Sequence, residues 1–222
     1  AAVYTTNLVK GAPLTVTKNN IANGKAQAVI CNSGNANTCN WNGIEIAEGM
    51  CALVEQHTGI AASDVVVAST GVIGQPLDIT PIAAGIPALV DSLSADGGAD
   101  AAEGIMTTDT VKKEVAVEFT VGGKTCRIGG IAKGSGMIHP NMCTMLAFLT
   151  TDLAIEKSLL QEAVSEVVTD TFNMITVDGD TSTNDSLIAM ANGQAGNDLI
   201  TTKDESYHTF KEALFFVCEY LA

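Results

Sequence analysis

Basic residues are scarce in this 222-residue sequence. Lys and Arg together number 11 against 25 Asp and Glu, and the formal net charge is -14. Because the basic residues do not cluster, the composition argues against a nucleic-acid partner or an anionic membrane surface. Long apolar runs are also missing, and none approaches the roughly 20 residues that a membrane-spanning helix needs. We therefore expect neither nucleic acid nor a membrane among the partners of this chain.

Paired cysteine motifs are missing as well. The six cysteines show no C-x-x-C spacing, which argues against a zinc site and against a disulfide framework. They are Cys31, Cys39, Cys51, Cys126, Cys143 and Cys218. We interpret them as reduced, mostly buried thiols, which are typical of a cytoplasmic protein.

A calcium-loop motif is also absent, and no metal site is predicted. The acidic segment 178–185 resembles the start of an EF-hand loop. However, Thr183 occupies the sixth position, where that loop needs glycine, and Ala189 occupies the twelfth, where it needs glutamate. A tight, internally hydrogen-bonded loop is the alternative that we predict.

The N-terminus has neither an initiator methionine nor a signal peptide, and residues 1–9 already show the pattern of a strand. It therefore does not have the pattern of a natural chain start. The hydrophobic content of 46% is enough for a real core, in one large domain or two small ones.

Strand and helix patterns alternate along the chain. Strands are predicted at 1–9, 26–31, 64–68, 114–121, 125–131, 144–150, 172–177 and 186–191. A turn or short helix is predicted at 18–24, helices at 43–57, 82–93, 99–106 and 205–222, and a further helix after a capping box at 158–161. The alternation favours an α/β fold in which the strand 144–150 is central.

Thr144 is the first candidate for a catalytic residue. It follows Cys143 at the junction between a glycine-rich loop and an apolar strand. A hydroxyl at such a junction can attack the carbonyl immediately before it. The α-amine that cleavage frees can then act as the base for the same hydroxyl. The alternative is a β-branched residue that simply opens a strand, and spacing alone does not decide between the two.

Three other positions have a functional and an ordinary interpretation. The strand and turn at 69–74 would leave backbone N–H groups pointing outward, as an oxyanion hole needs, but the same pattern is typical of a plain turn. Lys133 precedes Thr144 by 11 residues across the loop, and its alternative is a solvated surface charge. His57 lies on the apolar face of the helix predicted at 43–57, which is more typical of a core histidine than of a ligand or base.

Residues 132–152 resemble the self-cleavage segment of the ornithine acetyltransferase family, also called the bifunctional glutamate N-acetyltransferases. Further blocks match the family in the same order, at 2–7, 31–37, 69–74, 106–109 and 176–185. Two residues depart from the pattern, because His139 and Cys143 stand where the family usually has alanine. Cys143 contributes only its carbonyl to cleavage, so a small thiol fits there. His139 stays open between a passive loop residue and a local proton carrier.

The resemblance implies an αββα-like layered sandwich, similar in its logic to the N-terminal-nucleophile hydrolases. It also implies cleavage between Cys143 and Thr144. The products would be an α-chain portion, 1–143, and a β-chain portion, 144–222, which stay together and assemble as an α2β2 heterotetramer. Relative to the family the sequence is expected to be incomplete at both ends, and a substrate-binding glutamate lies in the missing C-terminal part.

The activity that the resemblance implies is ping-pong acetyl transfer from N-acetylornithine to glutamate, in arginine biosynthesis. Thr144 would carry the acetyl group, and its α-amine would act as general base and acid. Thr70 and Gly71 match the residues of the family's oxyanion hole, while Thr107, Lys133 and Thr144 match its substrate-binding residues. No metal or organic cofactor is implied, since the protein itself carries the acetyl group. Whether acetyl-CoA also serves as donor stays open.

Two other functions stay open from the sequence. The same self-activated nucleophile, with water as acceptor, would make an aminopeptidase or amidohydrolase. Acyl transfer needs a pocket that excludes water, which a sequence does not reveal. The second alternative is a non-catalytic fragment or assembly module.

Overall fold

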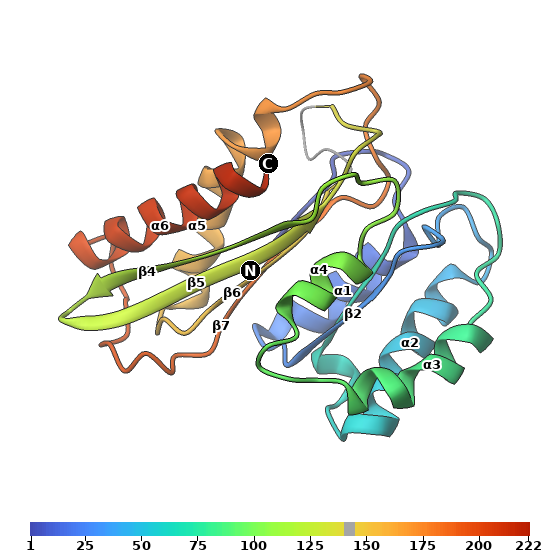
Figure 1. Cartoon of the computed structure of the whole chain (residues 1–222), viewed down its shortest axis with the longest axis horizontal. Helices are drawn as coiled ribbons and strands as arrows, with labels where there is room; N and C mark the ends of the chain where they lie inside the picture. Colours follow the sequence, from blue (N-terminus) through green and yellow to red (C-terminus); the bar gives the residue numbers. More distant parts are fainter. Residues whose placement is uncertain (140–144) are drawn as a thin grey trace.

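The computed structural model describes residues 1–139 and 145–222. Strands within these ranges are β1 (Ala2–Tyr4), β2 (Ala28–Asn32), β3 (Val65–Ser69), β4 (Lys113–Val121), β5 (Lys124–Lys133), β6 (Leu146–Thr151) and β7 (Ser186–Ala191). In the described part of the chain they form a five-stranded mixed sheet, in the order β1-β7-β6-β5-β4, and a parallel pair, β2-β3 (Figure 1). The strand predicted at 144–150 corresponds to β6. Its predicted central position is confirmed, because β6 lies in the middle of the larger sheet.

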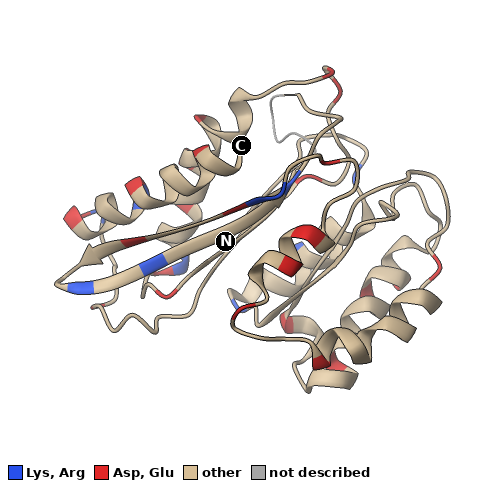
Figure 2. Ribbon diagram, viewed as in Figure 1, with Lys and Arg blue, Asp and Glu red and all other residues tan. Residues whose placement is uncertain are grey.

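The helices are α1 (Ala12–Asn20), α2 (Gly43–Thr58), α3 (Thr80–Asp91), α4 (Gly98–Gly104), α5 (Lys157–Thr169) and α6 (Glu205–Leu221). Short 3-10 turns occur at η1 (Ile21–Asn23), η2 (Ala62–Asp64) and η3 (Phe172–Met174). In the part of the chain that the structure describes, no helix is both long and apolar enough to cross a membrane. Figure 2 shows the Lys and Arg residues scattered over several elements, while acidic residues lie on helices of both outer layers.

Three hydrophobic clusters within the described ranges separate four layers, in the order helix, sheet, sheet, helix (Figure 1). The first cluster packs α5 and α6 onto the five-stranded sheet. The second lies between the sheets and joins Val66 and Ala68 of β3 to Leu146 and Phe148 of β6. The third packs the small sheet against α1, α2 and α3. The predicted αββα-like sandwich is therefore confirmed.

The two-sided burial of β3 explains its uninterrupted apolar sequence. Successive strand side chains point to opposite faces. Val65 and Val67 belong to the cluster with the helices, whereas Val66 and Ala68 belong to the cluster between the sheets. A strand covered on both faces loses the apolar–polar alternation. β3 ends at Ser69, so the turn that contains Thr70 begins directly after this buried strand.

Other periodic patterns are confirmed. β4 and β5 pair as an antiparallel hairpin, and in β4 half-buried residues alternate with exposed ones, as predicted for a sheet with one wet face. The residues predicted to form the apolar face of the helix after 158 are all buried in α5. They are Leu159, Leu160, Ala163, Val164, Val167 and Val168.

The strand predicted at 172–177 is wrong. Phe172 to Met174 form η3, and the chain continues as a loop to Asp185. Phe172 is buried in the core under α5, but Met174 and Val177 are largely exposed. The apolar residues of this segment therefore do not define one buried face of a strand. The backbone N–H of Val177 instead donates to Ile138 O at 2.8 Å, within the loop before the predicted nucleophile.

The predicted strand at 1–9 is too long, and the helix α1 was missed. Pairing with β7 stops at Tyr4, and Leu8 is 99% exposed. The side chain of Asn7 accepts the Val9 N–H at 2.9 Å, which makes a local turn. Gly24 closes η1 in a left-handed conformation, as predicted for the end of that segment, but the helix before it begins at Ala12.

The capping box and the interpretation of His57 are also wrong. Helix α5 begins at Lys157 with Glu156 as N-cap, and no side chain caps it. Gln161, the expected capping residue, instead bonds the backbone of Ala2 through both amide atoms, at 3.0 and 2.9 Å. His57 is exposed in the last turn of α2, so it is not a core histidine. Gln161 and Ala2 are 159 positions apart in the sequence, and the packing of α5 beside β1 brings them into contact.

The cysteines within the described ranges are unpaired, and three of the five are buried. Cys143 lies outside the described residues. Among the described residues, no group of three or more His, Cys, Asp or Glu side chains is arranged to hold a metal ion.

Candidate active site

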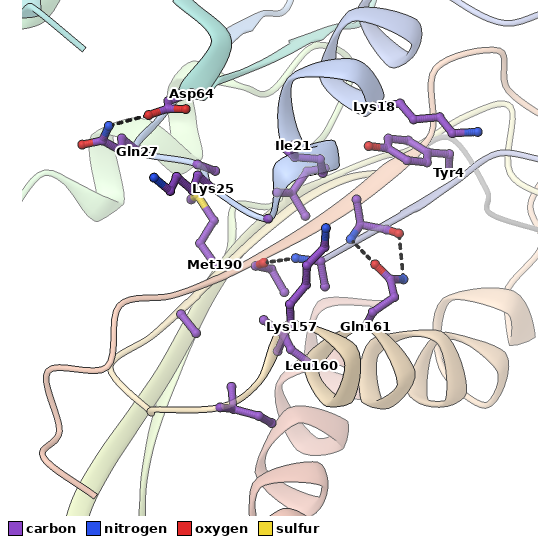
Figure 3. Close-up of a pocket in the computed structure, with 18 residues that line it drawn as sticks. Tyr4, Lys18, Ile21, Lys25, Gln27, Asp64, Lys157, Leu160, Gln161 and Met190 are labelled. Atoms are coloured by element: carbon purple, nitrogen blue, oxygen red, sulfur yellow. Dashed lines mark hydrogen bonds between the residues drawn. The ribbon is translucent and has the colours of Figure 1, made fainter. Parts of the chain in front are cut away.

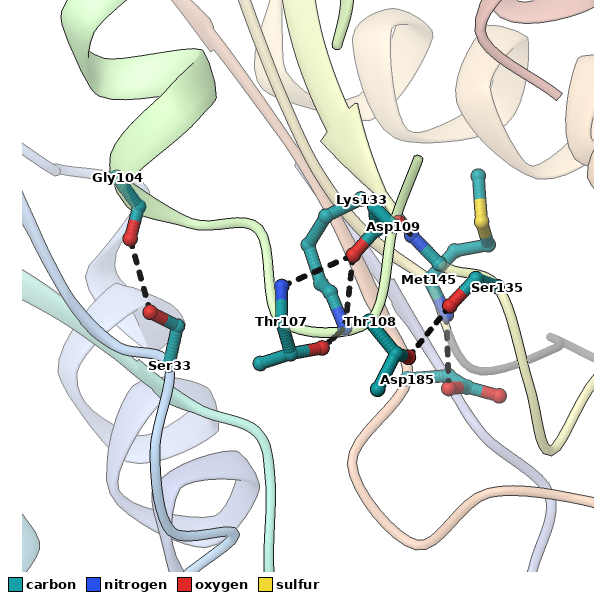
Figure 4. Close-up of polar contacts among 10 residues, drawn as sticks. Ser33, Gly104, Thr107, Thr108, Asp109, Lys133, Ser135, Met145 and Asp185 are labelled. Atoms are coloured by element: carbon teal, nitrogen blue, oxygen red, sulfur yellow. Dashed lines mark hydrogen bonds and ion pairs between the residues drawn. The ribbon is translucent and has the colours of Figure 1, made fainter. Parts of the chain in front are cut away.

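Lys133 and Thr107, both predicted as substrate-binding residues, lie together at the end of β5 (Figure 4). Lys133 Nζ donates to Thr107 Oγ1 at 2.8 Å, although the residues are 26 apart in the sequence. Lys133 is only 3% exposed, so it is not a solvated surface charge. A buried ammonium needs a partner anion, because removing a charge from water is costly.

Asp109 is that partner, and sequence reasoning assigned it no role. Its Oδ2 lies 3.7 Å from Lys133 Nζ, and its side chain is 3% exposed. Oδ2 also accepts the Thr107 N–H at 3.0 Å, and Oδ1 accepts the Gly134 N–H at 2.5 Å. Burial raises the pKa of Asp109, but these two hydrogen bonds and the charge of Lys133 outweigh it, so the net shift is downward. The pair is therefore a buried ammonium and an ionised carboxylate.

The loop that carries Thr107 is held at two further points (Figure 4). Thr108 Oγ1 and Ser135 Oγ lie 2.6 Å apart, which joins it to the loop after Lys133. Ser33 Oγ donates to Gly104 O at 2.8 Å, which joins the end of α4 to the loop after β2. These contacts bring segments near 33, 104–109 and 133–135 to one place.

Thr70 and Gly71, the residues expected to form an oxyanion hole, follow directly after β3. Gly71 has φ +127°, and a Cβ there would lie 2.4 Å from the carbonyl atoms of Gly34, so only glycine fits. The Thr70 N–H donates to Asn32 O at 2.9 Å and is not free to bind an oxyanion. Neither Thr70 Oγ1 nor the Gly71 N–H makes a hydrogen bond to any described residue. Among the described residues, the Gly71 N–H is therefore an unpaired donor of this turn, and Thr70 keeps its hydroxyl as a donor.

Asn184, another residue without a predicted role, holds the start of this turn. Its Nδ2 donates to Ser69 O at 2.8 Å and to Ala36 O at 2.6 Å. Its Oδ1 accepts from Thr38 Oγ1 at 2.6 Å. The side chain is buried, and these partners lie up to 148 residues away in the sequence. The turn containing Thr70 is therefore tied to the loop that precedes β7.

Asp185 extends this connection to the strand that follows Thr144. Its Oδ1 accepts the Met145 N–H at 3.0 Å, and the residue is 0% exposed. Its Oδ2 has no hydrogen-bond partner among the described residues. Burial raises the pKa of Asp185 to about 8, although the hydrogen bond from Met145 and the charge of Lys133 act against the rise. The signal for Asp185 in the sequence is an acidic residue placed immediately before an apolar strand.

Cys143 and Thr144, the predicted cleavage site and nucleophile, lie outside the described residues. His139, for which the sequence leaves two roles open, is exposed. The structure therefore brings Thr107 and Lys133 into contact and connects the turn at Thr70 with the start of β6 through the adjacent residues Asn184 and Asp185.

A cavity of about 840 Å³ lies elsewhere, between β1, β7, η1 and the start of α5 (Figure 3). Lys18, Lys25 and Lys157 line it, together with Gln161. None of the predicted site residues borders this cavity, so its position separates it from the candidate active site.

Replacing Asp185 by Asn is expected to change how stability depends on pH. Because the native pKa, about 8, exceeds the ordinary 3.8, the native state binds more protons than the unfolded state between these values. The free energy of unfolding should therefore fall as pH rises from 4 to 8, and Asp185→Asn should remove that part of the slope. The gain of the variant over the wild type at pH 8 should be on the order of several kcal/mol at most. Urea unfolding at pH 5 and pH 8 measures it, and parallel pH slopes of the two proteins would contradict the assignment.

Comparisons with known proteins show what this chain is similar to. The ArgJ family model matches residues 1–222. The arginine biosynthesis bifunctional protein ArgJ of Symbiobacterium thermophilum is 52% identical over 223 residues, which are 100% of this chain and 56% of that protein. The chain thus spans little more than half the length of the curated relatives that it matches.

Two solved structures are similar as well. The crystal structure of the arginine biosynthesis bifunctional protein ArgJ from Bacillus halodurans has 44% identity and a TM-score of 0.59, covering 66% of this chain and 75% of that one. The ornithine acetyltransferase of Mycobacterium tuberculosis, in complex with ornithine, has 31% identity and a TM-score of 0.52, covering 66% and 76%. With a family model matched along its whole length, a layered fold and relatives of this similarity, the chain belongs to the ArgJ family.

Proposed function

We propose that the protein containing these residues transfers an acetyl group from N-acetylornithine to glutamate, as a step of arginine biosynthesis. The observation that carries the proposal is the buried Lys133, which contacts the buried side chain of Asp109 and the hydroxyl of Thr107 beside the loop that leads to Thr144. Lys133 and Thr107 supply an ammonium and a hydroxyl that suit the carboxylate of an amino acid. Membership of the ArgJ family and the ornithine-bound relative from Mycobacterium tuberculosis support the same substrate class.

The chemistry would proceed in two halves. After cleavage between Cys143 and Thr144, the α-amine of Thr144 takes the proton of its own hydroxyl while the oxygen attacks the acetyl carbonyl of N-acetylornithine. Ornithine leaves with that proton on its amine, and the acetyl group remains as an ester on Thr144. The amine of glutamate then attacks the ester and gives up a proton to the α-amine of Thr144, which passes a proton to the threonine oxygen as N-acetylglutamate leaves.

Thr70 and Gly71 would stabilise the charge that develops on the carbonyl oxygen in both halves. Thr70 Oγ1 and the Gly71 N–H are the donors that no described residue uses. Donors held rigidly in this way need no reorganisation during the reaction. The packing of Gly71 on Gly34 and the hold of Asn184 on Ser69 O supply that rigidity.

The proposal extends to the assembly and location of the protein. The two portions, 1–143 and 144–222, would stay associated because β6, α5, β7 and α6 contribute much of the first and second hydrophobic clusters. We place the assembled protein in the cytoplasm as an α2β2 heterotetramer. Whether acetyl-CoA serves as an additional donor can be tested in the assay described next.

An acceptor-dependence assay tests the proposed function. The full gene product that carries these residues is mixed with N-acetylornithine labelled in its acetyl group, with and without glutamate. We expect labelled N-acetylglutamate to form with glutamate and little labelled acetate without it. Acetate released at the same rate in both samples would make the protein an amidohydrolase, and the absence of both products would make it non-catalytic.

Replacing Lys133 by Met is expected to weaken binding of both substrates while self-cleavage continues. Loss of a charge-assisted hydrogen bond should raise KM for N-acetylornithine and for glutamate by roughly 10- to 100-fold. Steady-state kinetics with each substrate varied, and the mass of the chains, provide the two readouts. Lys112→Met is the matched control, because Lys112 is exposed. If Lys133→Met stays uncut yet binds N-acetylornithine normally, Lys133 serves maturation rather than substrate binding.

A further inference from the structure

The loop before β7 contacts both ends of the segment that contains the predicted cleavage site. On the N-terminal side, Asp178 Oδ2 accepts the Met137 N–H at 2.6 Å, and Oδ1 accepts the Ile138 N–H at 2.8 Å. On the C-terminal side, Asp185 Oδ1 accepts the Met145 N–H at 3.0 Å. These contacts join residues 40 or 41 positions apart in the sequence.

The contacts of Asp178 fix a strained part of the backbone. Met137 has φ +56°, in the left-handed region that non-glycine residues rarely adopt. A carboxylate that accepts two successive N–H groups, one on each oxygen, restrains both peptide planes at once. The backbone of Ile138 is held on its other side as well, because Ile138 O accepts from Val177 N at 2.8 Å and from Thr176 Oγ1 at 3.2 Å. The hydrogen bonds from Met137 and Ile138 also keep the pKa of Asp178 below its ordinary value, so it carries a charge at neutral pH.

The loop that carries the two aspartates is itself held by the N-terminal segment. Asn7 Nδ2 donates to Thr181 O at 2.8 Å, and Thr5 Oγ1 donates to Ser182 O at 2.8 Å. The Thr5 N–H donates to Asp185 O at 3.0 Å. The Gly11 N–H also donates to Thr183 O at 2.9 Å. The loop is therefore held in place between Asp178 and Asp185, which lie seven positions apart.

We propose that Asp178 and Asp185 act as a two-point clamp, which holds the backbone of Met137, Ile138 and Met145 on the two sides of the predicted cleavage site and so promotes self-cleavage. Asp178 fixes the direction of the chain entering the segment, and Asp185 fixes the first peptide N–H after Thr144. Both are positioning residues, since they bond the backbone beside the cleavage site. The proposal rests on the cleavage that is part of the proposed function. Attack of a side chain on the preceding carbonyl depends steeply on the geometry of the reacting atoms, which is what a clamp would supply.

The test measures the rate of self-cleavage in the full gene product, by intact mass and denaturing gel electrophoresis after a pulse of synthesis. Asp178→Asn keeps the shape but replaces one acceptor oxygen by an amide donor, which faces an N–H. We expect cleavage to slow by about 10-fold or more, the size of one charge-assisted hydrogen bond. Asp180→Asn is the matched control, because it removes the same charge from the same exposed loop without touching Met137 or Ile138. Asp178→Glu, which keeps both acceptor oxygens, should recover part of the rate.

A second variant tests the other end of the clamp. Asp185→Leu removes the acceptor for the Met145 N–H and should also slow cleavage by about 10-fold. Because Asp185 is buried and Asp178 is exposed, the Asp178 variants decide the matter if Asp185→Leu does not fold, as judged by circular dichroism and Tm. Slow cleavage of Asp178→Asn with an unchanged Tm supports the clamp.

Two results would overturn it, and they are distinguishable. If the wild type cuts itself and Asp178→Asn cuts at the rate of Asp180→Asn, the clamp is wrong while the proposed function stands. If the wild-type gene product is active yet never cut, self-cleavage is removed from the proposed function, and the clamp falls with it.

Discussion

Replacing Thr144 by Ala is expected to give a single uncut chain without acetyltransferase activity. The substitution removes the hydroxyl that would attack the Cys143 carbonyl and later carry the acetyl group. Turnover should fall to background, since the same oxygen serves both reactions. Intact mass under denaturing conditions shows one chain or two, and transfer of labelled acetyl to glutamate shows the activity. The wild type should give two chains that divide between residues 143 and 144.

Thr144→Ser is the matched variant, because serine keeps the hydroxyl and loses only a methyl group. We expect it to cut itself and to retain measurable transfer. After digestion, the acetyl label should be found on the peptide that begins at residue 144. A full gene product that remains one chain by mass and still acetylates glutamate at the wild-type rate would rule out the mechanism.

Replacing Thr70 by Ala is expected to lower the turnover number by about 10²–10³, the usual loss for one oxyanion-hole donor. The reason lies in the turn after β3. There the Thr70 N–H is already bonded to Asn32 O, which leaves the hydroxyl as the donor of that residue. KM should change little, because the interaction strengthens only as charge develops on the carbonyl oxygen. Steady-state kinetics with N-acetylornithine and glutamate separate the two constants.

Thr70→Ser provides the control, since it keeps the hydroxyl at a buried position. It should retain most of the turnover. Equal turnover numbers for Thr70→Ala and the wild type would remove Thr70 from the oxyanion hole. The same test fails at Gly71, because an added Cβ would meet the Gly34 carbonyl at 2.4 Å and displace the turn. For this reason, loss of activity in Gly71→Ala would not identify a donor.

The acidic segment 178–185 shows how a motif can be recognised without its role. Its sequence predicted a tight loop with internal hydrogen bonds, and one such bond joins the Asn184 N–H to Ser182 Oγ at 3.1 Å. Most of its side-chain contacts, however, reach segments far along the chain, at residues 36–38, 69, 137–138 and 145. The spacing of acidic residues contains no information about such partners.

What the sequence determined by itself is several of the elements and their buried faces. The uninterrupted apolar run of β3, the alternation in β4 and the apolar stripe of α5 each follow from a periodicity that the backbone imposes within a few residues. The motif at 132–152 and its companion blocks were enough to identify the family and the layered fold. These features are local, so a window of the sequence contains them completely.

Only the tertiary structure decided which polar groups meet. It paired Lys133 with Asp109, placed Asn184 on the end of β3 and Asp185 on the start of β6, and gave Gln161 to β1 rather than to a helix cap. It also turned 172–174 into η3, because burial of Phe172 under α5 outweighed the strand propensity of the segment. The physical reason is the same in each case. A buried polar group must find a hydrogen-bond or charge partner, and the packing of layers, not distance along the chain, determines which partner lies within reach.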